Sequence, residues 1–205
     1  MAALNLGAAG SAPAVVATHD AAAWWGWPLA LVPVLLAILL ARAAARRRDS
    51  RPAFPVDLAS LPAPARLAVL FYVIATALTH LFAVGAIWQA TRVNYHGNAE
   101  YFRYMSLLQL FRMSHQHAFG HGTMYFLLGL LVAATRAGDG WKVLAISLTG
   151  LGASADLASW WLQKFSGPSF EPLSVTGGAC FAAGYALAAA LILRELVRRA
   201  PSQTV

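Results

Sequence analysis

Histidine is the residue type that most clearly points to chemistry in this sequence, because four of the six histidines fall inside long apolar stretches. His80 lies in one stretch, and His115, His117 and His121 lie together in another. Ionisable side chains are costly inside a membrane, so they mark candidate functional sites. Imidazole nitrogen binds iron, copper and zinc well, and a metal or cofactor site is therefore the first hypothesis.

Helical spacing divides the clustered histidines between two faces of one helix. His117 and His121 are four residues apart and share a face. His115 projects to nearly the opposite side, together with Arg112. Asp156, in a later apolar stretch, is expected at the depth of the histidines, roughly 10–20 Å below one surface at 1.5 Å per residue.

A b-type haem is the cofactor that this pattern favours. It would lie between two helices, with His80 and either His117 or His115 as axial ligands. Arg112 would lie beside a haem propionate, because guanidinium groups pair well with carboxylates. The matched depth of the histidines and the small residues around them favour this set.

A bare copper, iron or zinc ion is the alternative, and it remains open. Its ligands would be His80, His117 and His121, with Asp156 as a fourth ligand or as the partner of a ligand. The spacing His-x-His-x-x-x-His favours this set, because histidines four residues apart on a helix chelate one ion readily.

Two further classes of function use the same residues. The histidines and Asp156 would form a pathway for metal ions or protons, or they would only hold the helices of a structural subunit together. The sequence contains no GxGxxG, P-loop, HExxH, CxxC or CxxCH motif. No catalytic residue or substrate is indicated, and whether the chain is an enzyme stays open.

The composition places these residues in a membrane. Of 205 residues, 59% are hydrophobic and 11% are charged, whereas a soluble domain carries about 25% charged residues. An ordinary soluble enzyme and a disordered chain are thereby excluded. The net charge of +7 does not predict a nucleic-acid partner, because the basic residues lie at the ends of apolar stretches. The expected surroundings are a lipid bilayer.

Five apolar stretches predict an all-α polytopic bundle with five transmembrane helices, since each reaches the length of roughly 20 residues that a span needs. The third stretch is the least apolar. We expect one transmembrane domain over 24–199, after an outer segment at 1–23 and before a cytoplasmic tail at 200–205. The predicted spans are 24–45, 67–90, 105–135, 143–162 and 175–196.

The basic residues predict an N-terminus outside and a C-terminus inside a bacterial-type inner membrane. Eleven of them fall on the expected cytoplasmic side and three on the other, as the positive-inside rule requires. The eleven are Arg42, Arg46, Arg47, Arg48, Arg51, Arg66, Arg136, Lys142, Arg194, Arg198 and Arg199, and the three are Arg92, Arg103 and Lys164.

Through His80, Arg112, His115 and His117, the chain resembles the b-type cytochrome membrane subunits of bacterial respiratory complexes. The resemblance covers the second to fourth predicted helices, about half of the chain. It implies haem b at a site that passes electrons between quinol and a partner protein. It also implies other membrane subunits or a periplasmic redox protein as partners.

Overall fold

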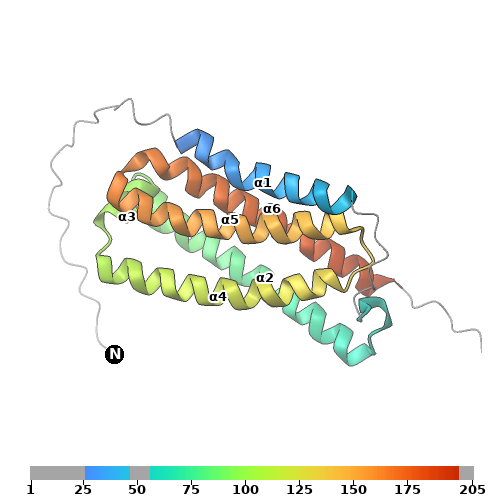
Figure 1. Cartoon of the computed structure of the whole chain (residues 1–205). Helices are drawn as coiled ribbons and strands as arrows, with labels where there is room; N and C mark the ends of the chain where they lie inside the picture. The colour runs from blue at the N-terminus through green and yellow to red at the C-terminus, as the bar shows by residue number, and fades with distance from the viewer. Residues whose placement is uncertain (1–25, 47–55, 199–205) are drawn as a thin grey trace, which may run out of the picture.

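The structure is a computed structural model that describes residues 26–46 and 56–198. All elements within those residues are helical, and five helices of 21–28 residues run alternately in opposite directions (Figure 1). Their ends agree with the predicted spans to within four residues wherever the structure describes them. The five are α1 (Gly26–Arg46), α2 (Ala63–Trp88), α4 (Leu107–Ala133), α5 (Asp139–Ser166) and α6 (Glu171–Val197).

Some of the sequence predictions fall outside the described residues. These are the outer segment at 1–23, the start of the first span, the tail at 200–205, and four of the basic residues counted for orientation. Those four are Arg47, Arg48, Arg51 and Arg199.

Local sequence signals account for several helix ends. Pro62 precedes α2 and Pro64 lies in its first turn, where a missing N–H and a fixed φ suit a helix start. The Ser106 hydroxyl caps α4 by accepting a hydrogen bond from the Gln109 N–H at 3.2 Å. Helix α5 ends at Gly167, whose φ of +93° is readily adopted by glycine.

The connection between α2 and α4 is helical, whereas the sequence predicted a loop over 91–104. Helix α2 continues into a π-helical turn, η3 (Gln89–Asn94), and a short helix, α3 (Asn98–Tyr104), follows. Phe102 of α3 is buried and stacks on Trp160 of α5, with ring centroids 5.4 Å apart. The apolar contact holds α3 across one end of the bundle.

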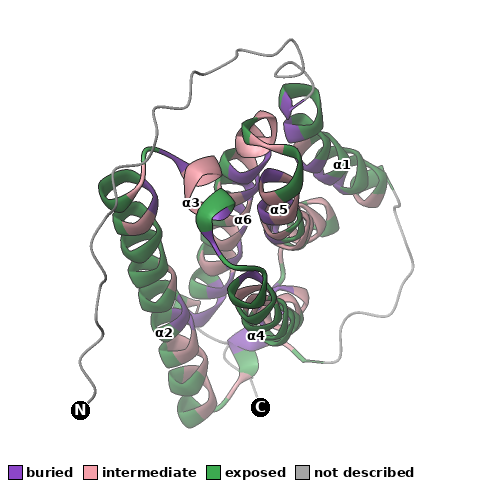
Figure 2. Cartoon of the chain, turned by 90° about the vertical axis from the view of Figure 1, so that its left-hand side faces the viewer, coloured by how far each residue is buried: buried purple, intermediate pink, exposed green. Residues whose placement is uncertain are grey.

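Helices α5 and α6 form the centre of the bundle and approach each other closely. A Cβ added at Gly152 would lie 2.7 Å from the Gly177 carbonyl oxygen, and one at Gly184 would lie 2.5 Å from the Thr149 backbone nitrogen. Only glycine permits backbones this close. Much of the burial lies along these two helices, and α1 covers them on one side (Figure 2).

Helix α2 is the least buried of the long helices. Among its 26 residues only Val73 and Thr76 are buried. Two hydrogen bonds connect α2 to its neighbours. The Tyr72 hydroxyl donates to the Met124 carbonyl oxygen of α4 at 2.6 Å. The Tyr185 hydroxyl of α6 donates to the Val73 carbonyl oxygen at 2.8 Å. Much of the apolar surface of α2 therefore faces outward, as a lipid-exposed helix requires.

Within residues 26–46 and 56–198, four helical segments are long and apolar enough to cross a membrane. They are α1, α2 with its continuation to Asn94, α5, and α6 together with the turn η4 (Pro168–Phe170) before it. Helix α4 has the length of a span but carries the histidine run, and it is not among the four. Helix α4 corresponds to the predicted span 105–135, which is the least apolar of the five stretches in the sequence.

Candidate functional site

The predicted histidines lie between two apolar clusters of the bundle. One cluster includes Val73, Leu128 and Ile192, and the other is formed by Phe102, Met105, Leu110 and Trp160. Between them, α2 contributes one histidine and α4 contributes two. Helix α5 contributes a carboxylate and α6 contributes aromatic rings. Four helices thus surround the candidate site.

His80 is half-buried and its ring is fixed on both sides. Nδ1 lies 2.5 Å from the Thr76 carbonyl oxygen, to which it donates as an N–H. The ring packs against Phe181 and Tyr185 of α6, with centroids 4.7 and 4.8 Å away. Because Nδ1 carries the proton in this arrangement, Nε2 remains an acceptor or a metal ligand.

His117 and His121 share one face of α4, as helical spacing predicted. Their ring centroids are 5.3 Å apart. His117 repeats the arrangement of His80, with Nδ1 2.8 Å from the Met113 carbonyl oxygen and the ring edge-on to Trp160 at 4.9 Å. His121 stacks on Phe181 at 5.9 Å. Phe181 therefore lies against a histidine from α2 and a histidine from α4.

The proposed ligands are not drawn together as a bare metal site would require. In the part of the chain that the structure describes, no three His, Cys, Asp or Glu side chains form a group that could hold a metal ion. His117 and His121 contact each other, but Phe181 lies between His80 and His121, and Trp160 lies between His117 and Asp156.

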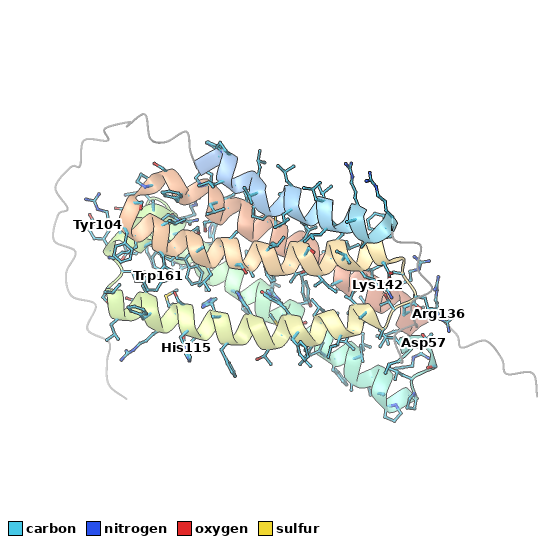
Figure 3. The ribbon with its side chains drawn as sticks, viewed as in Figure 1. Asp57, Tyr104, His115, Arg136, Lys142 and Trp161 are labelled. Atoms are coloured by element: carbon cyan, nitrogen blue, oxygen red, sulfur yellow. The ribbon has the colours of Figure 1, made fainter. Side chains whose placement is uncertain are left out.

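His115 and Arg112 lie on the other face of α4, and both are exposed. His115 projects from α4 away from the rest of the bundle (Figure 3). The structure thus brings His117 and His121, but neither His115 nor Arg112, to the side of α4 that faces the aromatic rings of α5 and α6.

Asp156 links α5 to α6 and accepts hydrogen bonds from two donors. Its Oδ1 accepts from the Ser174 hydroxyl at 2.7 Å and from the Trp160 indole N–H at 3.2 Å. Other polar residues of its helix also face the interior, since Thr149, Ser159 and Gln163 are all buried. Through Trp160, Asp156 helps to orient the surface on which His117 packs.

Sequence reasoning missed Phe181 and Tyr185 at the site, and Glu195 near the opposite, basic end of the bundle. Phe181 and Tyr185 carried no signal, because aromatic residues are ordinary in apolar helices. The buried Tyr125 hydroxyl has no hydrogen-bond partner among the described residues. Glu195 could have been noticed as an acid near the end of an apolar helix. It is 2% exposed, and its Oε1 accepts from Arg198 at 3.1 Å.

One ion pair lies at each end of the bundle. At one end the Arg136 guanidinium donates to Asp57, with Nε 3.1 Å from Oδ2 (Figure 3). This hydrogen bond and the Ala59 N–H lower the pKa of Asp57. At the other end Arg92 pairs with Glu171 at 3.4 Å. Both pairs are partly exposed, so each contributes little to stability.

The fold and composition define an all-helical integral membrane protein. A family model named Aq_1264_TM, described as a transmembrane helical domain, matches residues 85–203, which is more than half of the chain. The chain belongs to this family. No curated protein and no solved structure matches it significantly.

Proposed function

We propose that this membrane protein binds a metal-centred redox cofactor, with haem b as the first choice, and serves electron transfer. One observation carries the proposal. The Nδ1 atoms of His80 and His117 each donate to the backbone carbonyl oxygen four residues earlier. Metal-ligating histidines are usually oriented in this way, which leaves Nε2 for the metal.

The geometry favours His117 over His115 as the partner of His80. His117 faces the aromatic surroundings that Trp160 and Phe181 provide, whereas His115 is exposed on the opposite face. Flat apolar rings suit the faces of a macrocycle. We therefore leave His115 and Arg112 out of the proposed site.

A copper, iron or zinc ion is the second candidate, and a separate observation supports it. The rings of His117 and His121 lie side by side on one face of α4, with centroids 5.3 Å apart. In this version of the proposal, both side chains would rotate to close on one ion, and His80 would complete the set. Asp156 would act as a supporting group, since its Oδ1 already accepts two hydrogen bonds.

We propose α4 as the fifth span, and its connections to α5 support this. The Lys164 ammonium near the end of α5 donates to the Met105 carbonyl oxygen just before α4, at 2.6 Å. The Lys142 ammonium near the start of α5 donates to the Ala133 carbonyl oxygen at the end of α4, at 3.0 Å. Helix α4 is thus antiparallel to α5 along its whole length. If α5 crosses the bilayer, α4 crosses it too.

The ends of the bundle differ in charge, which supports the proposed orientation in a bacterial inner membrane. Among the described residues, the end with Asp57 and Arg136 holds seven basic side chains, whereas Arg92, Arg103, Arg112 and Lys164 lie toward the other end. The basic end faces the cytoplasm in this proposal. His80 and His117 lie nearer the opposite face, and we place them within reach of a quinone, a periplasmic redox protein or another membrane subunit.

Three alanine variants test the site. The protein, expressed with an adequate supply of iron and haem precursor, is purified in detergent, and bound haem and metal are measured per chain. We expect His80→Ala and His117→Ala to lose the cofactor, because each removes a ligand. His115→Ala is the matched control and should retain it, because His115 projects away from the site.

His121→Ala separates the two cofactors. With haem bound, this variant should shift the spectrum and leave occupancy unchanged. With a three-histidine ion site, it should remove the metal. Full occupancy in a monodisperse, helical His80→Ala protein would overturn both versions of the proposal.

A further inference from the structure

A groove at the basic end of the bundle carries an inference independent of the histidine site. It has a volume of about 360 Å³ and lies between the first turns of α2 and the last turns of α6. Its walls include Arg66, Leu67 and Leu70 from α2, and Leu193, Leu196 and Val197 from α6. Apart from Arg66, the lining is apolar.

The groove is open to the outside of the helical bundle. Leu67 is 51% exposed and Val197 is 80% exposed, although both belong to helices apolar enough to span a membrane. Arg66 lies one turn into α2, and Leu70 lies about 6 Å deeper at 1.5 Å per residue. The groove therefore combines a cation near the membrane surface with an apolar channel that leads inward from it.

The charges around the groove favour a negatively charged occupant. Among the described residues, the Arg66 side chain makes no hydrogen bond or ion pair, and two of the three acids at this end are already paired, Asp57 with Arg136 and Glu195 with Arg198. The basic residues of this end are Arg42, Arg46, Arg66, Arg136, Lys142, Arg194 and Arg198.

We infer that this groove binds an anionic phospholipid. An acyl chain lies along the leucines of α2 and α6, and the phosphate pairs with the Arg66 guanidinium. Basic pockets between membrane helices recognise anionic headgroups in this way. The occupant also covers the sparsely packed start of α2, so it holds that helix against α6.

Native mass spectrometry with two lipids tests the assignment. Delipidated protein is titrated with phosphatidylglycerol or with phosphatidylcholine of the same acyl chains. We expect at least one phosphatidylglycerol molecule to bind more tightly than phosphatidylcholine. Arg66→Gln should weaken that binding roughly fivefold and leave phosphatidylcholine unchanged, because one basic group near the surface supplies about this factor.

Two further variants keep the test specific. Arg46→Gln on α1 removes a cation from the same end but not from the groove, and it should leave binding unchanged. Leu70→Trp fills the groove and should weaken both lipids. Equal losses from Arg66→Gln and Arg46→Gln would mean diffuse attraction and would overturn the site. A second copy of the chain is the competing occupant. If the delipidated protein dimerises and Leu67→Lys restores the monomer, the second copy fills the groove and the lipid assignment is wrong.

Discussion

At the scale of single residues, the interior of this bundle is organised by hydrogen bonds that leave particular atoms free. His80 and His117 donate from Nδ1 to backbone carbonyl oxygens, so Nε2 of each remains available as an acceptor or a metal ligand. In Asp156, by contrast, the Oδ1 atom already accepts hydrogen bonds from Ser174 and Trp160. The histidines are therefore the candidate ligands, and Asp156 is a supporting residue.

Replacing Asp156 with alanine should destabilise the bundle. The Trp160 indole N–H and the Ser174 hydroxyl would each lose an acceptor in the interior, which costs about 1–3 kcal/mol per unsatisfied group. Thermal unfolding in detergent measures the loss. Ser154→Ala, at an exposed position of the same helix, is the control and should change little. Equal stability of the two variants would show that the carboxylate does not hold α5 to α6.

At the scale of helices, the glycines of α5 and α6 determine how the centre packs. Gly152 lies against backbone atoms of Gly177 and Phe181, which cannot move aside as a flexible side chain would. Phe181 in turn contacts the histidines of two other helices. The close approach of α5 and α6 thus sets the position of the aromatic wall of the site.

Two glycine-to-alanine variants on α5 test this packing. A Cβ at Gly152 would lie 2.5 Å from the Phe181 backbone nitrogen, whereas one at Gly150 would have no neighbour within 4 Å. We expect Gly152→Ala to lose about 1–3 kcal/mol through overpacking. Gly150→Ala should be neutral or gain up to about 1 kcal/mol from helix propensity. Unfolding temperatures that fall equally in both would contradict the packing.

The helices were predictable from the sequence, but the contacts of the site were only partly so. Apolar stretches of nearly 20 residues mark helices whatever their partners are, and the shared face of His117 and His121 follows from spacing alone. Both faces of α4 carry histidine, however, so spacing cannot say which face turns inward. Phe181 and Tyr185 come from α6, far along the chain, and nothing in their type marks them as neighbours of His80.

At the scale of the whole molecule, the alternating directions of the helices give the chain two distinct ends (Figure 1). One end gathers most of the described basic residues, and the other carries α3 and the turn before α6. His121 lies at the middle of α4, and His80 and His117 lie nearer the end that carries α3. Because the two ends differ in charge, the two sides of a membrane that the protein crosses are not equivalent for it.

Cysteine labelling tests whether α4 crosses the membrane. Asn94→Cys and Gly138→Cys are introduced singly in a Cys180→Ala background, before and after α4. A membrane-impermeant maleimide should label position 94 in intact cells and position 138 only after lysis. Both should label in the denatured protein. Labelling of both positions in intact cells would mean that α4 lies along one surface, against the proposed fifth span.

The most direct test of the central claim is the absorption spectrum and metal content of the purified, unmodified protein. The proposed site predicts a Soret band with about one haem per chain, or, for the bare-ion alternative, about one copper, iron or zinc ion per chain without that band. A well-folded protein with neither haem nor stoichiometric metal, even after reconstitution with both, would contradict the claim.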